Sequence, residues 1–219
     1  MKKQSNKKDI LFFIIVGILF LAIIYVIIND VLVGMQTKEM IASGKSTLKS
    51  GPIQRKINGN KHETIDLKGA QITKLATYDI TGLVLGMEYY YFGGGANKIS
   101  PEDLVLAWGP AATSKYSDDI SVKIGGNDRF LNYSIKGEYY RDYNDVAGNY
   151  ISNNHIIPIN NTVKNILKKV RKGDVVQIIG YLVECQGNNW HWGPSSMSRT
   201  DSGAHACEII LAESIYILE

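Results

Sequence analysis

The stretch NTVKNILKKVRKGDVVQIIGYLVE, residues 161–184, indicates the fold class of this chain most directly. Its first half carries four apolar residues at helical spacing: Val163, Ile166, Leu167 and Val170. Gly173 ends this pattern, and residues 174–184 are then apolar on both faces, as is typical of a strand in the middle of a sheet. A helix between the third and fourth strands is a feature of the five-stranded Greek-key OB fold. We therefore predict a mainly β domain, an OB-like β-barrel with one or two short helices, with a general antiparallel sandwich as the alternative.

Outside this stretch, further segments show the two-residue period of strands. They are residues 71–92, residues 120–135 with a hairpin turn at Gly125-Gly126-Asn127-Asp128, residues 150–158 and residues 206–218. Ser100-Pro101-Glu102-Asp103 is instead typical of a helix start, because a hydroxyl can cap the helix and proline suits its first position. We therefore expect a short helix after residue 100.

Nineteen consecutive uncharged residues, Ile10 to Ile28, precede the domain. A helix of that length rises about 28 Å, close to the thickness of a bilayer core. The lysines at positions 2, 3, 7 and 8 place the N-terminus in the cytoplasm. A cleaved secretory signal is the alternative, but Asn29 to Gly34 offers no small-residue cleavage site. We predict a cytoplasmic tail (1–9), a transmembrane helix acting as a signal-anchor (10–28), a juxtamembrane segment and linker (29–62) and an extracytoplasmic β-rich domain (63–219).

Charge is distributed unevenly between the tail and the domain. Four of the 24 basic and one of the 21 acidic side chains lie in residues 1–9, which leaves twenty of each sign in residues 10–219. A neutral domain argues against a nucleic-acid partner, since such binders carry a basic surplus. We expect a single-pass protein of a bacterial inner membrane, with its domain in the periplasm or outside the cell. Its expected partners are the membrane and an envelope protein or glycan, and no cofactor is predicted.

The reactive residue types gather at His155 and in the segment that follows residue 190. Ser196, His155, Arg199 and Asp201 are the candidates for catalysis, because a serine nucleophile needs a base within hydrogen-bond reach and a third group to orient that base. No G-x-S-x-G nucleophile elbow is present. A loop held by Arg199–Asp201 pairing and tryptophan packing explains the same residues without catalysis, so an enzyme is the less expected outcome.

Metal binding and a disulfide are the next chemistries to consider. His191, His205 and Cys207 are the types that bind zinc, but they lack the usual spacing, and no metal site is predicted. Cys185 ends one expected strand and Cys207 begins another. A disulfide bridge between them and a pair of buried free thiols are both open.

Aromatic and basic side chains suggest two surfaces. Trp190, Trp192, Tyr139 and Tyr140 are the candidate binding residues, because exposed aromatic rings stack on sugars or anchor a protein partner. Packing in the core of a sheet is the alternative role for these rings. The basic face of the helix after residue 161 could contact anionic lipid headgroups or be simply its solvated side.

Several segments together resemble a known family. They are residues 103–110 (DLVLAWGP), 154–158 (NHIIP), 170–176 (VRKGDVV) and 180–183 (GYLV), followed by Trp192, Ser195, Ser196, Arg199, Asp201, Gly203 and residues 206–208 (ACE). In these segments the chain resembles an uncharacterised family of bacterial single-pass inner-membrane proteins. The resemblance covers about half of the chain and implies that these segments form one domain; it implies no activity.

These observations predict a membrane-anchored extracytoplasmic binding or scaffolding domain of the bacterial envelope. The alternatives are a membrane-tethered hydrolase that acts on envelope material, and a structural subunit of a membrane assembly.

Overall fold

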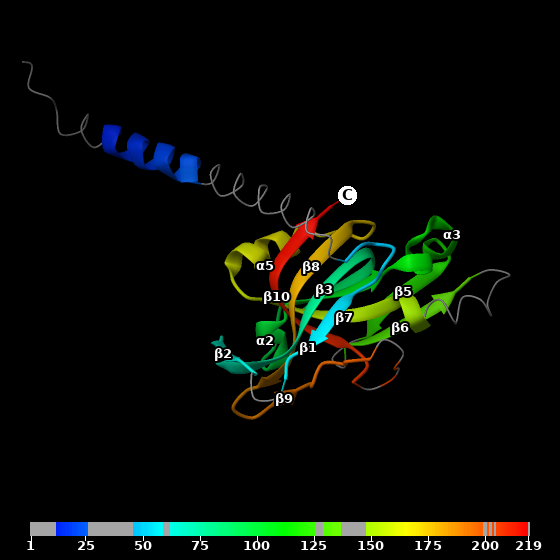
Figure 1. Ribbon diagram of the computed structural model, residues 1–219. Helices are drawn as coiled ribbons and strands as arrows, with labels where there is room; N and C mark the ends of the chain where they lie inside the picture. Colours follow the sequence, from blue (N-terminus) through cyan, green and yellow to red (C-terminus); the bar gives the residue numbers. More distant parts are fainter. Residues whose placement is uncertain are drawn as a thin grey trace, which may run out of the picture. The chain divides into compact units, whose positions relative to one another are not determined.

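The computed structural model describes residues 12–25, 46–58, 62–125, 129–136, 148–198, 201, 203 and 205–218. The fold is mainly β, with 48% of the described residues in strands and only short helices in the domain, as the sequence predicts. Contacts divide the chain into two units, residues 1–45 and residues 46–219, which we describe separately (Figure 1).

In the first unit, the structure describes an α-helix over residues 12–25. Its apolar side chains are mostly exposed, with Phe13 at 71%. Within the described residues, no helix combines the length and the apolar character that crossing a bilayer requires. Both ends of the predicted span, residues 10–11 and 26–28, lie outside the described residues.

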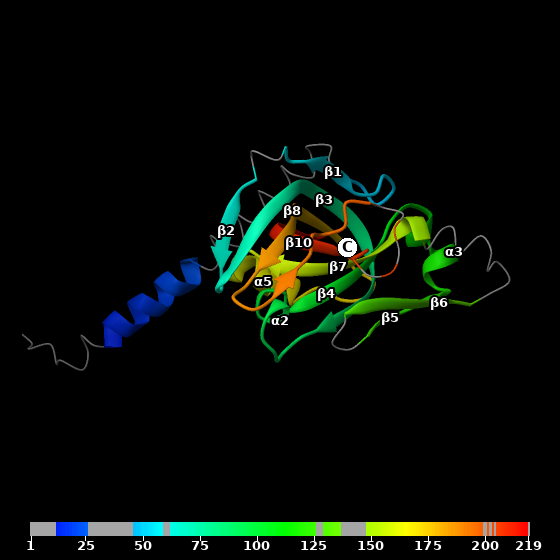
Figure 2. The same cartoon turned by 90° about the horizontal axis from the view of Figure 1, so that it is seen from below.

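Five strands of the second unit pair in a closed ring. They are β3 (Ala70–Tyr89), β4 (Glu102–Ala107), β7 (Ile151–Pro158), β10 (Glu208–Ile217) and β8 (Val175–Gln186), in that spatial order, and β8 pairs with β3 again. The β7–β10 pair is parallel, and the other four pairs of the ring are antiparallel. Figure 2 shows these strands from below, with the hairpin of β5 (Ile120–Gly125) and β6 (Phe130–Ile135) outside the ring, where β5 contacts β3.

The remaining elements extend the ring or connect its strands. They are β1 (Ile53–Lys56), β2 (Thr64–Leu67), the short helix α2 (Ala96–Ile99), the 3-10 helix η2 (Gly109–Ala112), α3 (Ser114–Ser117), α5 (Asn161–Leu167) and β9 (His191–Trp192). β1 and β2 pair with β3, and β9 pairs with β8. The connection from β7 to β8 contains α5, as the sequence predicts.

The core lies inside the ring because alternate residues of each strand point inward. Leu104 and Leu106 of β4, Ile156 of β7 and Ile178 of β8 are fully buried there in one cluster. α5 adds Val163 and Leu167 to the same cluster. β8 and β10 approach so closely that a Cβ atom at Gly180 would overlap the carbonyl oxygen of Leu211, which explains the glycine in an otherwise apolar strand.

A buried network fixes the start of the domain to β3. Ser46, with 8% of its surface exposed, donates from Oγ to Oδ1 of Asp79 at 2.6 Å. The Thr81 hydroxyl donates to the Ser46 carbonyl oxygen at 3.0 Å, and Gln177 donates to Asp79 Oδ1 at 3.0 Å. Ser46 is therefore part of the folded domain.

The structure corrects two of our predictions for the segments before residue 110. The helix expected after residue 100 is wrong: residues 102–107 form β4, because every one of them is buried between β3 and β7. Residues 53–56 lie within the segment predicted as linker, but they form β1, whose backbone pairs with residues 76–79 of β3. The domain therefore begins nearer residue 46 than residue 63.

Candidate functional site

The most unusual group of side chains lies on the outer face of β4 and β7. Asp103 and His155 are direct cross-strand partners in this pair of strands. Their neighbours Leu104 and Ile156 point into the core, so Asp103 and His155 point to the opposite face. The register of the ring thus brings together two titratable residues that lie far apart in sequence.

Asp103 is fully buried and is surrounded by hydrogen-bond donors. Nδ1 of His155 lies 2.8 Å from its Oδ1. Arg129 donates from Nε to Oδ2 at 3.0 Å and from Nη2 to Oδ1. The hydroxyl of Tyr90 also donates to Oδ2 at 3.0 Å. We call Asp103, Arg129, His155 and Tyr90 the Asp103 cluster.

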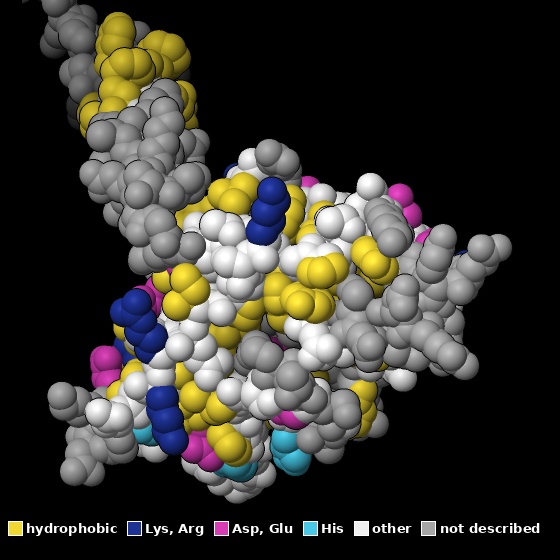
Figure 3. Space-filling model, turned by 45° about the vertical axis from the view of Figure 1, so that its right-hand side comes forward, with side chains coloured by type: hydrophobic (Ala, Val, Ile, Leu, Met, Phe, Trp, Pro, Cys, Tyr) yellow, Lys and Arg dark blue, Asp and Glu magenta, His cyan; other side chains and the backbone are white. Residues whose placement is uncertain are grey.

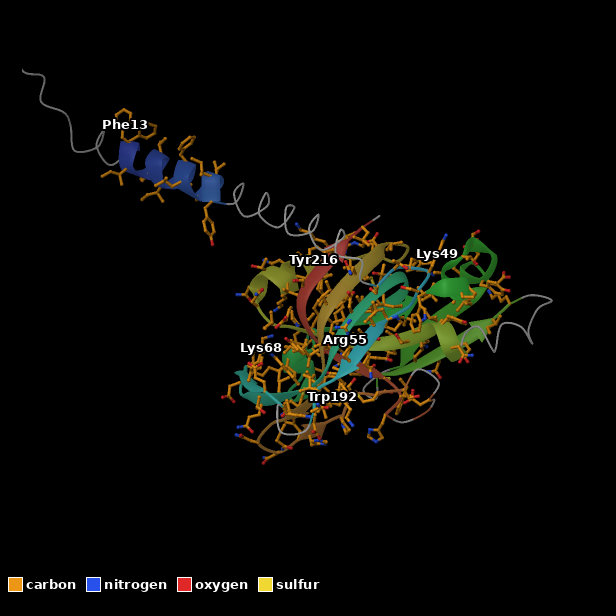
Figure 4. All side chains as sticks on the ribbon, in the orientation of Figure 1. Phe13, Lys49, Arg55, Lys68, Trp192 and Tyr216 are labelled. Atoms are coloured by element: carbon orange, nitrogen blue, oxygen red, sulfur yellow. The ribbon has the colours of Figure 1, made fainter. Side chains whose placement is uncertain are left out.

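Aromatic rings cover the cationic side of the Asp103 cluster. The guanidinium carbon of Arg129 lies 4.0 Å from the ring centroid of Tyr90 and 4.9 Å from that of Trp192. The rings of His155 and Trp192 are also 4.9 Å apart, centroid to centroid. Trp192 (labelled in Figure 4) therefore contacts both nitrogen-containing side chains and shields them from water.

Arg129 reaches this position through an unusual backbone conformation. Its φ of 56° lies in the left-handed region, which residues other than glycine rarely adopt. The side-chain nitrogen of Asn153 donates to the Arg129 carbonyl oxygen at 2.8 Å and holds the turn against β7. Outliers of this kind concentrate at functional sites, because the surrounding structure must compensate for their strain.

The electrostatics of the Asp103 cluster favour charge. Burial alone would raise the pKa of Asp103, but the hydrogen bond from His155 and the charges of His155 and Arg129 outweigh it and hold this pKa below its ordinary value. Asp103 is therefore a carboxylate at neutral pH. A histidine whose Nδ1 is held by a buried carboxylate has a fixed ring orientation, and its Nε2 is the nitrogen left for other contacts.

Two cavities lie near the cluster, and His155 lines the smaller one. The large cavity, of about 470 Å³, lies between β6, the start of β7 and residues 198, 201, 203 and 206–208. The small cavity, of about 210 Å³, is lined by His155, Trp192, His205 and Cys207 among others. Phe130 and Cys207 line both cavities. In Figure 3, histidine, acidic and hydrophobic side chains lie together along the lower edge of the face shown.

The predicted catalytic residues do not form one hydrogen-bonded unit. Ser196 donates from Oγ to Oδ2 of Asp201 at 2.7 Å, whereas the hydrogen bond of His155 goes to Asp103. Within the described residues, no hydrogen bond joins His155 to Ser196. Arg199 lies outside the described residues.

The predicted binding residues do not all lie at this site. Trp192 belongs to the site, but Trp190 packs over Gly187 and lines a third cavity with Lys68 and Lys98. Tyr139 and Tyr140 lie outside the described residues. The aromatic contacts of the site come instead from Tyr90 and Phe130, which we did not single out from the sequence.

Both cysteines are free thiols, so the bridge between Cys185 and Cys207 is not formed in this structure. The reason lies in strand pairing: Cys185 has Trp192 of β9 as its neighbour, while Cys207 lies beside Asn153, whose side-chain nitrogen is 3.5 Å from the sulfur. Burial raises the pKa of Cys207 to about 11 and that of Cys185 to about 12, so both thiols are protonated at neutral pH.

The residues considered for zinc are also dispersed. His191 pairs with Glu184 at 2.6 Å, while His205 and Cys207 line the small cavity. In the described part of the chain, no group of three or more His, Cys, Asp and Glu side chains is arranged to hold a metal ion.

Sequence reasoning missed Asp103, Arg129 and Asn153. The position of Asp103 directly before the apolar run 104–108 (LVLAW) was one available signal. Arg129 follows a hairpin turn and carries no local signal, since its role depends on a partner 26 residues away.

Comparison with protein-family models, with curated proteins and with solved structures finds no match to this chain. The family resemblance drawn from the sequence therefore stays a prediction.

Proposed function

We propose that this chain is a membrane-anchored extracytoplasmic binding domain of the bacterial envelope, and that its ligand occupies the large cavity. The observation that carries this proposal is the position of a 470 Å³ cavity beside the buried, fully hydrogen-bonded Asp103 cluster. Ligand pockets have volumes of about 300–1,000 Å³ and need a rigid wall. The cluster supports such a wall from behind: Asn153, which lines the cavity, donates to the Arg129 carbonyl oxygen, and Arg129 is itself held by Asp103, Tyr90 and Trp192.

We further propose that the ring is an OB-like β-barrel. Its spatial order, with β3, β4, β7, β10 and β8 as the first, second, third, fifth and fourth strands, supports this, as does α5 between the third and fourth. Domains of the OB type bind ligands on the face of their second and third strands and with the loops beside it. Here those strands are β4 and β7, which carry Asp103, Asn153 and His155.

The membrane anchor and the location outside the cytoplasm rest on the sequence. The apolar run 10–28 follows four lysines, and the remaining chain is neutral. A fusion of alkaline phosphatase to the C-terminus tests the topology, because this enzyme is active only outside the cytoplasm. We expect an active phosphatase and a dark green fluorescent protein at the same position; the reverse pattern would overturn the location.

The ligand site is tested by hydrogen–deuterium exchange on the full chain in lipid nanodiscs. The probe is a protein-free extract of bacterial envelope, made by digesting the wall to soluble fragments. We expect slower exchange in β6 and β7 in its presence, and no such change in Ala206→Trp, whose indole would fill part of the cavity lined by Ala206. Equal exchange with and without the extract would contradict a binding role for this cavity.

A hydrolase remains the second candidate, favoured by the 2.7 Å contact of Ser196 with Asp201 and by the Asp103–His155 pair. It requires His155 Nε2 to reach the Ser196 hydroxyl in the presence of substrate. A fluorophosphonate probe that labels Ser196 in the wild type, but not in His155→Gln, would support it. Absence of labelling leaves binding as the function.

A further inference from the structure

The large cavity presents hydrogen-bond acceptors to its ligand. The carboxylates of Asp201 and Glu208 line it, as do the amides of Asn132 and Asn153. Among the described residues that form its wall, none is lysine or arginine. Such a lining selects against phosphate and carboxylate groups, because no cation is there to balance them. It favours a ligand that carries hydrogen-bond donors.

Asn153 makes this requirement specific. Only 4% of its surface is exposed, and its amide nitrogen is used by the carbonyl oxygen of Arg129. Its Oδ1 has no hydrogen-bond partner in the part of the chain that the structure describes. A buried acceptor without a donor is unfavourable, and a shift of this side chain toward the cavity that it lines would let a ligand donate to Oδ1.

Two aromatic rings complete the site. Phe130 and Tyr133 of β6 line the cavity, and 44% and 42% of their surfaces are exposed. Exposed rings beside acceptors provide a flat apolar face for stacking and polar groups at its edge. Sugars have matching chemistry: hydroxyl donors around the ring and an apolar face of C–H groups.

We propose that the large cavity is a saccharide-binding site, in which the ligand stacks on Tyr133 or Phe130 and donates hydroxyl or amide hydrogens to Asn153 and Asp201. This inference rests on the proposed binding function of the same cavity and names its ligand class. A glycan of the cell envelope has this chemistry, and it would be within reach of a domain held at the membrane surface.

The test is a titration of the full chain in lipid nanodiscs, because many mild detergents carry sugar headgroups that would compete. The probes are the N-acetylglucosamine trimer and maltotriose, followed by calorimetry. We expect saturable binding of at least one of them and at least a tenfold weaker affinity in Tyr133→Ala. Tyr91→Ala is the matched control, since Tyr91 is 80% exposed and does not line the cavity.

Two variants of Asn153 test its hydrogen-bond acceptor independently of the stacking ring: Asn153→Asp and Asn153→Leu. The aspartate variant keeps the oxygen acceptor, so we expect it to bind the trisaccharide more tightly than the leucine variant does. Both variants lose the side-chain nitrogen that donates to the Arg129 carbonyl oxygen, so their thermal unfolding must be compared first. If either variant fails to fold, the affinity of Tyr133→Ala tests the proposal instead.

Spermidine is the competing probe, because an ammonium group is also a donor that suits acidic residues. Binding of spermidine without binding of either trisaccharide would overturn the saccharide class. So would the failure of all three probes. If the envelope extract still slows exchange in β6 and β7 in that case, the binding function stands and only the ligand class is wrong.

Discussion

Glu102 and Asp103 are neighbours on β4, and both carboxyl groups are almost fully buried, with 1% and 0% of each residue exposed. They point to opposite faces of the strand and differ in protonation. Burial raises the pKa of Glu102 to about 8, and the hydrogen bond with Tyr89 and the charge of Arg171 do not compensate. The pKa of Asp103 is lowered despite burial, because His155 and Arg129 surround it.

This pair shows that partners, and not burial, decide the charge of a residue in this domain. Asp103 has four donated hydrogen bonds from three side chains, whereas Oε1 of Glu102 has no hydrogen-bond partner among the described residues. The outer face of β4 thus holds a fixed charge, and the end of its inner face holds a carboxyl group that is neutral at pH 7.

The largest expected effect is that of Arg129→Met. This change removes the main cation from a buried carboxylate, and we expect the free energy of unfolding to fall by about 3–5 kcal/mol. Chemical unfolding of the full chain in detergent micelles, followed by tryptophan fluorescence, measures it. Arg55→Met on the exposed strand β1 is the control and should change stability by less than about 0.5 kcal/mol. A loss below about 1 kcal/mol in Arg129→Met would mean that His155 and Tyr90 suffice to hold Asp103.

A smaller loss in the free energy of unfolding is expected for Tyr90→Phe. The ring under Arg129 stays, but the hydroxyl that donates to Asp103 Oδ2 at 3.0 Å is removed. A hydrogen bond to a charged group is worth about 1.5–3 kcal/mol, which sets the expected loss in the same unfolding measurement. Tyr91→Phe provides the matched control, because Tyr91 is 80% exposed. Equal stability of the two variants would show that the hydroxyl contributes nothing to the charge of Asp103.

The smallest effect concerns the pH dependence of stability through Glu102. Between its ordinary pKa of 4.5 and its raised pKa of about 8, the folded protein holds a proton that the unfolded chain has lost. Stability therefore falls as pH rises through this window, by up to about 1.4 kcal/mol from pH 7 to pH 8. Glu102→Gln should reduce this fall, and Glu88→Gln, on an exposed position of β3, should not. Unfolding curves at the two pH values measure both, and an unchanged fall in Glu102→Gln would assign it to another group.

The sequence predicts the strands that are apolar on both faces or that alternate strictly. All but the first of residues 174–184 fall within β8, the hairpin of 120–135 is formed, and α5 begins where the pattern of Val163 and Leu167 places it. Asn160 caps α5, because its side-chain oxygen accepts from the backbone of Val163 at 3.0 Å.

The segment after Ser100 shows where local signals fail. Ser100-Pro101-Glu102-Asp103 has the composition of a helix start, yet residues 102–107 pair with β3 and β7 on their two edges and are all buried. Tertiary packing overrides local propensity in such a segment. β1 was missed because four residues in a polar segment carry too little periodicity to be recognised.

Only part of the site was accessible from the sequence. The sequence indicates His155 and Trp192 because their side chains are reactive or aromatic. It does not indicate Asp103, because the segment that contains Asp103 has the pattern of a helix start. The contact that gives His155 its role spans 52 residues and follows from the register of β4 against β7. Without that register, His155 was assigned to Ser196 instead.

The network at Ser46 has a mechanical consequence. Asp79 and Thr81, to which Ser46 is bonded, lie in the middle of the 20-residue strand β3. At Asp79, β3 is paired with β1 on one edge and with β8 on the other. Tension that enters the domain at Ser46 is therefore shared by several rows of hydrogen bonds at once, and no strand is peeled from its end. A pull applied at Ser46 would therefore be resisted by the middle of the sheet and not by the end of one strand.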